Sequence, residues 1–241
     1  MEELKHILFI DIETVSVVAD HSQMSPGLQK EWAKKAKFLK SSVTENADAA
    51  LLFNEKAGRF SEFAKVVCIG FGSFHKHDGE WKMRLKALTG HSEKDLLNDF
   101  CGVLSRFIEY YPQLRFCGHN IKEFDIPFLC RRMIINGMGL PECMQLNGKK
   151  TWEITHLDTL ELWRFGDYKH YTALSLLAEI LGIPSPKEDI DGSMVGNVYW
   201  KDGDLQRIGH YCMQDVLTAA RVYLKLKGIS DVDPEPIYVN D

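Results

Sequence analysis

Apolar and polar residues are arranged along the chain in blocks that predict strands first and helices later. The segment ILFIDIETVS opens with four consecutive apolar residues, which is typical of a buried strand, and this strand is expected to end on Asp11 and Glu13. Residues two apart in a strand point to the same face, so the two carboxylates are expected to project side by side. Their mutual repulsion requires a compensating partner.

Turn and capping signals divide the rest of the chain. Residues 66–88 predict a hairpin around Asp78-Gly79, a dipeptide that favours a tight turn. Ser92, with Asp95 three residues later, begins an amphipathic helix that stops before Pro112. The further elements expected are a strand at 114–119, a helix at 124–135, a strand at 152–160, a helix at 172–182 and a helix at 204–228.

This order of elements predicts an α/β fold with a mixed central sheet and helices on both faces. We expect residues 1–241 to form a single domain. Within it, residues 17–64 are interpreted as a helical insertion, because their apolar residues are too few for a core of their own. Residues 229–241 form a short acidic tail that is expected at the surface or without order.

Composition narrows the class of protein. The 45% hydrophobic content supports an ordinary packed core, and the net charge of -5 argues against coating nucleic acid by bulk electrostatics. No signal region and no apolar window of about 20 residues occurs, so we expect a cytoplasmic protein without a membrane partner. The six cysteines contain no CxxC pair, which indicates small core residues rather than a zinc site or disulfides.

A second carboxylate anomaly lies in the final helix. Asp215 fills the gap in an apolar stripe, and burying an ionised carboxylate without a partner is costly. The stripe is formed by Leu205, Ile208, Cys212, Ala219, Val222 and Leu226. A further carboxylate, Asp125, sits near the start of the helix at 124–135, where aspartate is also a favourable helix-terminal residue. If these four carboxylates converge, two divalent cations such as Mg²⁺ or Mn²⁺ are needed to offset their repulsion.

Three ordered segments that carry these carboxylates, FIDIET, GHNIKEFDIPFL and YCMQD, resemble the exonuclease motifs of the DEDD superfamily of 3'-5' exonucleases. The middle segment is most similar to the proofreading exonuclease domain of B-family DNA polymerases. The resemblance spans residues 9–215 and implies a ribonuclease H-like fold. We expect no polymerase domain in the same chain.

The resemblance also implies a chemistry and a set of roles. Asp11, Glu13 and Asp215 would hold one cation, and Asp11 with Asp125 a second. A metal-activated water would attack the terminal phosphodiester of a single-stranded end and release a nucleoside 5'-monophosphate. The nucleotide would contact Thr14, His119, Asn120 and Phe124.

Two subclasses of the superfamily differ in the residue that orients the water, and this sequence contains both spacings. Tyr211 stands four residues before Asp215, and His210 stands five before it. In a continuous helix a residue four back shares the face of Asp215, whereas one five back is turned away by roughly 140°. We therefore expect the tyrosine (DEDDy) type, with a break in the helix at His210 as the rival arrangement.

The motifs leave several functions open. The main hypothesis is a hydrolase with 3'-5' exonuclease activity on single-stranded DNA, as in DNA repair. An exoribonuclease that trims RNA and a catalytically silent nucleic-acid-binding domain are the alternatives, because contacts to a 2'-hydroxyl cannot be read from these residues. The basic runs at 34–37, 131–132 and 149–150 are interpreted as solvated charges that would guide a strand only if they rim one groove.

Overall fold

In the computed structural model of the chain, the described residues are 2–42, 44, 46–184, 190–230, 232 and 234–239. Some of the expected tail and insertion therefore lies outside them. The tail residues concerned are Asp231, Asp233, Asn240 and Asp241, and the insertion residues are Val43 and Glu45. In the part of the chain that is described, no helix combines the length and the apolar character needed to cross a bilayer.

A six-stranded mixed sheet with the strand order β5-β4-β1-β2-β3-β6 forms the centre of the protein. The strands are β1 (Ile7–Ser16), β2 (Ala64–His77), β3 (Glu80–Thr89), β4 (Arg115–Gly118), β5 (Leu157–Asp158) and β6 (Glu235–Tyr238). β2 pairs antiparallel with both β1 and β3, and the other three pairings are parallel. The expected α/β class with a mixed sheet is confirmed.

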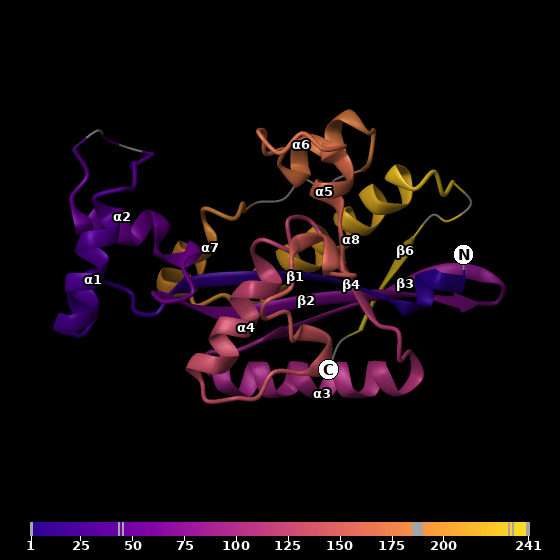
Figure 1. Cartoon of the computed structure of the whole chain (residues 1–241), viewed down its shortest axis with the longest axis horizontal. Helices are drawn as coiled ribbons and strands as arrows, with labels where there is room; N and C mark the ends of the chain where they lie inside the picture. The colour runs from indigo at the N-terminus through magenta and orange to yellow at the C-terminus, as the bar shows by residue number, and fades with distance from the viewer. Residues whose placement is uncertain are drawn as a thin grey trace.

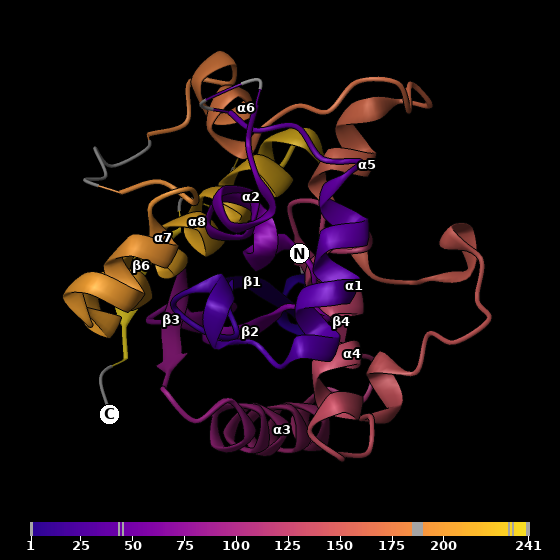
Figure 2. The ribbon, with the colours of Figure 1, turned by 90° about the vertical axis from the view of Figure 1, so that its left-hand side faces the viewer.

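Eight α-helices surround this sheet in the described chain (Figures 1 and 2). They are α1 (Pro26–Ala36), α2 (Ala49–Lys56), α3 (Glu93–Tyr110), α4 (Asp125–Ile135), α5 (Thr159–Arg164), α6 (Leu174–Ile180), α7 (Val195–Asn197) and α8 (Leu205–Leu226). Short 3-10 helices span Glu2–His6, His21–Gln23, Ala57–Arg59, Glu142–Met144 and Thr151–Glu153, and a π-helical turn spans Val198–Asp202.

The helices cover both faces of the sheet. α3 and α4 lie on one face, and α8 lies on the other together with α5 and α6 (Figure 1). Alternate residues of β1 pack on opposite faces of the sheet. Ile10 and Ile12 pack into the core under α3 and α4, whereas Phe9 packs toward α8. The two faces of β1 are therefore both buried, as its continuous apolar run indicates.

Several local predictions are confirmed in detail. The hairpin turns at Asp78 and Gly79, whose φ angles of 51° and 85° are the left-handed values that a tight two-residue turn requires. The Ser92 hydroxyl accepts the Asp95 backbone N–H at the start of α3. α8 begins at Leu205 and runs without a break to Leu226.

Strand β1 is longer than predicted. It does not end at Asp11 but continues to Ser16, because its backbone stays paired with β2 as far as Ala64. The pairing shifts register between Glu13 and Thr14. Asp11 and Glu13 therefore belong to the interior of a strand. Pairing with β2 at the residues before and after them fixes their positions.

The insertion does have a small core of its own, so the premise that it lacks one was wrong. Its centre is Trp32, which is fully buried and donates its indole N–H to the Ala49 carbonyl. Phe53, Phe60 and Phe63 pack edge-on against this indole. A few aromatic side chains thus bury enough area to order this segment, although the segment contains few apolar residues.

One further prediction fails: the strand expected at 152–160 is reduced to Leu157–Asp158, because the Asp158 carboxylate caps α5.

The acidic tail lies at the surface, which is one of the two arrangements expected for it, and part of it is ordered. Glu235–Tyr238 forms the mostly exposed strand β6 beside β3, and Glu235 pairs with Lys82 at 2.7 Å.

The prediction that Arg132 is a solvated charge is also wrong. Its guanidinium is buried and binds the buried Glu93 carboxylate through two nitrogens, with the shortest contact at 2.6 Å. Arg132 also donates to the Ser61 carbonyl, and Glu93 accepts from the Val66 backbone and the Asn136 amide. This network joins α3, α4 and β2 at one point.

Replacing Arg132 by Met should lower the free energy of unfolding by about 3 to 5 kcal/mol, because it leaves the Glu93 carboxylate buried without its cation. Urea unfolding measures the loss. The exposed neighbour Arg131 provides the matched control, and Arg131→Met should change stability by less than about 0.5 kcal/mol. Equal effects of the two substitutions would contradict a structural role for the buried pair.

Candidate active site

Four carboxylates from three separate elements line one cavity of about 880 Å³. Asp11 and Glu13 come from β1, Asp125 from the first turn of α4, and Asp215 from the middle of α8. Further walls come from the insertion and from the segment around α7. The structure therefore brings together all four carboxylates that the sequence singled out.

The close approach of α8 to the sheet positions this arrangement. Gly70 on β2 pairs with Asp11, and a Cβ atom at Gly70 would lie 2.7 Å from the Cys212 sulfur and 3.2 Å from its carbonyl oxygen. Any side chain at Gly70 would therefore push α8 away. Since Asp215 lies one turn beyond Cys212, the glycine also fixes how closely Asp215 approaches β1.

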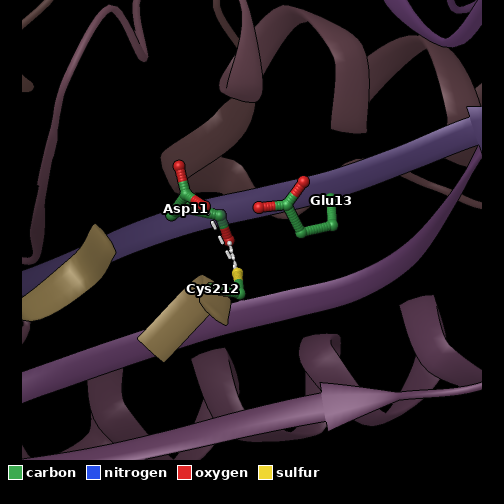
Figure 3. Close-up of side chains that lie close together, drawn as sticks. All are labelled: Asp11, Glu13 and Cys212. Atoms are coloured by element: carbon green, nitrogen blue, oxygen red, sulfur yellow. Dashed lines mark hydrogen bonds between the residues drawn. The ribbon is translucent and has the colours of Figure 1, made fainter. Parts of the chain in front are cut away.

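Cys212 does more than fill the apolar stripe. Its thiol donates to the Asp11 carboxylate at 3.3 Å and contacts the Asp11 carbonyl at 3.4 Å (Figure 3). Asp11, Glu13 and Cys212 each offer a ligand atom, and these atoms lie within 4.8 Å of one another. The side-by-side projection expected for Asp11 and Glu13 is confirmed, and the thiol restricts the orientation of Asp11.

Asp125 connects α4 to β1. Its carboxylate accepts the backbone N–H of Ile12 at 3.1 Å, and the side chain is 3% exposed. As the first residue of α4 it also faces the positive end of that helix. The helix-terminal role and the site role that the sequence left as alternatives for Asp125 are thus compatible.

The four carboxyl groups are strongly perturbed. Burial, followed by the charge of Asp125, raises the pKa of Asp11 well above its usual range, and burial followed by the charge of Asp11 does the same for Glu13. Burial raises the pKa of Asp125 to about 7. Burial also raises the pKa of Asp215 to about 6, against a hydrogen bond from Tyr211 that lowers it.

The donor set fits divalent cations. The pKa values of these carboxyls are shifted mainly by burial, by hydrogen bonds and by one another's charges. No lysine or arginine is among the largest causes of these shifts in the described chain. Two unit charges about 4 Å apart repel by roughly 4 kcal/mol at an effective dielectric near 20. Oxygen ligands of this kind suit hard cations such as Mg²⁺ or Mn²⁺, which would relieve both the repulsion and the burial.

The two candidates for orienting a water molecule lie on different sides of α8. Tyr211 is partly buried and hydrogen-bonds to Asp215. Its hydroxyl lies near Gly192, a residue that lines the cavity: a Cβ atom added to Gly192 would be 3.8 Å from that hydroxyl. Burial and then the charge of Asp215 raise the pKa of Tyr211. His210 is exposed, and its ring lies 6.2 Å from that of Tyr238. The unbroken helix thus groups Tyr211, and not His210, with the carboxylates.

The residues expected to contact a nucleotide, Thr14, His119, Asn120 and Phe124, all line the cavity. Thr14 has a structural contact as well, because its hydroxyl donates to the Gly58 carbonyl at 2.6 Å. This bond ties the insertion to β1. Both ring nitrogens of His119 are engaged, one by the Thr159 hydroxyl at 2.9 Å and the other near the Thr172 carbonyl at 2.8 Å.

Other lining residues were missed by the sequence analysis. Arg59 and Lys201 bring positive charge to the cavity, and Tyr171 and Trp200 bring aromatic rings. None of them belongs to a motif: Arg59 lies in the insertion, Tyr171 between α5 and α6, and Trp200 and Lys201 in the π-helical turn after α7. Their proximity arises only from the tertiary fold. The basic runs at 34–37, 131–132 and 149–150 contribute no residue to the described lining.

Comparisons with known proteins agree with this geometry. The chain is similar in fold to a family B DNA polymerase from the hyperthermophilic archaeon Pyrobaculum calidifontis, with a TM-score of 0.52 and 16% sequence identity over 93% of the chain. The chain spans 26% of that polymerase. This similarity confirms the expected ribonuclease H-like fold, in which helices flank a mixed sheet. A search of curated proteins gives no match.

A family model described as "Predicted 3'-5' exonuclease related to the exonuclease domain of PolB" matches residues 60–236. The matched range includes Asp125, Tyr211 and Asp215 but begins after β1, which carries Asp11 and Glu13. It covers well over half of the chain. The chain therefore belongs to this family of predicted nucleases related to the PolB exonuclease domain.

Proposed function

We propose that the protein is a 3'-5' exonuclease of the DEDDy type that removes nucleoside 5'-monophosphates from single-stranded DNA ends with the help of two divalent cations. The observation that carries the proposal is the convergence of Asp11, Glu13, Asp125 and Asp215 on one cavity, where burial raises the pKa of each carboxyl. Membership of the exonuclease family supports the reaction class.

The carboxylates have distinct places in this proposal. Asp11, Glu13 and Asp215 hold one cation, and Asp11 with Asp125 holds the second, directly or through water. When bound, the cations supply activation of a water molecule and neutralisation of the charge that develops on the phosphodiester. The Cys212 thiol keeps one Asp11 oxygen occupied, so it limits the directions in which Asp11 can bind.

Tyr211 orients the attacking water in this proposal. Its hydroxyl lies beside Asp215 and is held protonated by burial and by the carboxylate charges, so it acts as a hydrogen-bond donor or acceptor and not as a base. His210 is exposed, and its ring lies 6.2 Å from that of Tyr238. Neither His210 nor Tyr211 is among the residues that line the cavity in the described chain, but Tyr211 is hydrogen-bonded to Asp215, which does line it.

The primary test is hydrolysis of labelled single-stranded DNA and RNA with Mg²⁺ or Mn²⁺. Asp11→Asn should reduce the rate by about a hundredfold or more, because it removes a charge shared by both cation sites. Asp99→Asn, at an exposed position on α3, is the matched control and should match the wild type. DNA should be the better substrate. Preferential cleavage of RNA would assign the RNA-trimming alternative, and no cleavage of either would reject an exonuclease.

Tyr211→Phe should lower kcat by about 10²-fold to 10⁴-fold, because the water loses its orienting hydroxyl, while the melting temperature changes little. His210→Ala should leave kcat within about twofold, since the side chain is exposed. Steady-state kinetics with a DNA oligonucleotide measure both. The reverse outcome, an intact Tyr211→Phe rate with a slow His210→Ala variant, would assign the histidine type.

Crowding of the carboxylates should make Asp125→Asn more stable than the wild type at pH 8 without divalent cations. The pKa of Asp125 is about 7 in the folded protein and near 3.8 when unfolded, so its charged form is disfavoured by folding. Its destabilising contribution is absent below about pH 4 and complete above about pH 7. The stability gain of Asp125→Asn should therefore be on the order of 1 to 4 kcal/mol at pH 8 and fall to roughly a third of that value at pH 5.

Urea unfolding at both pH values in the presence of a chelator measures this gain as a difference between variant and wild type. The difference removes the contribution of other titrating groups, such as His156, whose pKa burial lowers to about 4. Saturating Mn²⁺ should stabilise the wild type more than the variant. A variant that is less stable than the wild type at pH 8 would show that the carboxylate is not under electrostatic strain.

A further inference from the structure

Three exposed aromatic side chains lie within seven residues between α5 and α6. Phe165 is 88% exposed, Tyr168 is 66% exposed and Tyr171 is 63% exposed. They recur every third residue, so the segment has no buried face to which these rings belong. Aromatic side chains gathered in solvent in this way mark an interaction site.

The segment is continuous with the proposed active site. Tyr171 lines the cavity, and its ring meets the ring of His119 edge-on at 6.2 Å. Phe165 and Tyr168 lie outside the described lining. One of the three exposed rings thus belongs to the cavity wall, and the other two precede it in the chain at exposed positions outside the wall.

Both ends of the segment are anchored to the strand end that carries His119 and Asn120. At the start, Asp158 caps α5 and also accepts the Asn120 backbone N–H at 2.9 Å. At the far end, the His119 ring holds the Thr172 carbonyl at 2.8 Å. The aromatic rings are thus presented on a segment whose two ends are fixed relative to Asp125, which lies in the same motif.

Phe165 also has an unfavourable backbone conformation. Its φ of 45° and ψ of 34° are left-handed values that cost a bulky residue about 1 to 3 kcal/mol, and Gly166 follows with a φ of 91°. The penalty is not offset by burial of the ring, which faces solvent. A conformation of this kind at a surface position is consistent with a ring kept available for a ligand.

Positive charge accompanies the rings. The Arg164 guanidinium lies 5.7 Å from the centre of the Tyr168 ring, and Lys169 is exposed next to it. At the cavity end, burial and then the charge of Asp125 raise the pKa of Tyr171, and Arg59 of the insertion, which also lines the cavity, partly opposes this rise. Alternation of aromatic faces with cations is the pattern by which proteins hold single-stranded nucleic acid without reading its sequence.

We propose that Tyr171, Tyr168 and Phe165 form a stacking surface for the unpaired bases upstream of the 3' end that occupies the cavity, an inference that rests on the proposed exonuclease function. A single strand fits this surface because its bases expose free π-faces, whereas the bases of a duplex already stack on one another. The surface makes the affinity depend on strand length, because each added nucleotide reaches a further ring.

The test measures binding and hydrolysis of DNA oligonucleotides of two to eight nucleotides. For the wild type, Kd in Ca²⁺ without turnover, and KM in Mg²⁺, should fall as the strand lengthens. Phe165→Ala combined with Tyr168→Ala should raise both constants about tenfold or more for the longer strands and leave those for the dinucleotide unchanged. Phe165→Trp with Tyr168→Phe should restore the length dependence, because stacking needs the ring and not the hydroxyl.

Tyr110→Ala supplies the matched control, since Tyr110 is 79% exposed at the end of α3, across the sheet from α8. Longer strands that bind the double alanine variant as tightly as the wild type would overturn the stacking surface, as would a wild type that binds no oligonucleotide. A wild type that binds strands through these rings but hydrolyses none of them would keep the surface and reject the exonuclease. The stacking surface and the exonuclease activity can therefore be rejected independently of each other.

Discussion

The close contact between α8 and the sheet is the constraint on which the rest of the site depends. Gly70 permits it, because any larger residue would meet the Cys212 sulfur and backbone. The contact places Asp215 opposite the two β1 carboxylates and brings the Cys212 thiol onto Asp11. A small change in the distance between one helix and one strand would therefore change the geometry of the whole donor set.

This arrangement opposes stability, and other parts of the fold offset it. Like charges are held in a buried cavity, where burial raises the pKa of each carboxyl. Around it, α3, α4 and α8 pack on both faces of the sheet, and the Arg132–Glu93 pair fixes α3 to α4. The pair contrasts with the cavity: Glu93 has the Arg132 guanidinium bound to it, whereas the strongest influences on the four carboxyls of the cavity in the described chain include no lysine or arginine.

The sequence predicted the parts of the fold that depend on local pattern. The hairpin at Asp78-Gly79, the cap at Ser92 and the continuity of α8 follow from backbone preferences and apolar spacing. The sequence analysis missed what tertiary pairing decides: β1 runs past Asp11 and Glu13 because β2 pairs with it as far as Ser16, and part of the surface tail forms β6 by pairing with β3. Apolar counts also missed the small core around Trp32, because a few large rings bury more area than their number suggests.

The carboxylates of the site could be recognised in the sequence, whereas the lining residues that would select a ligand could not. Carboxylates can be recognised in the sequence where they interrupt an apolar pattern, as Asp215 does in α8. Arg59, Lys201 and Tyr171 interrupt nothing, since each lies in a polar segment where such residues are common. Yet these residues form much of the wall that a substrate strand would meet. Two proteins with identical carboxylate motifs can therefore differ in what they bind through residues of this kind, which come from the insertion, the turn after α7 and the α5–α6 segment.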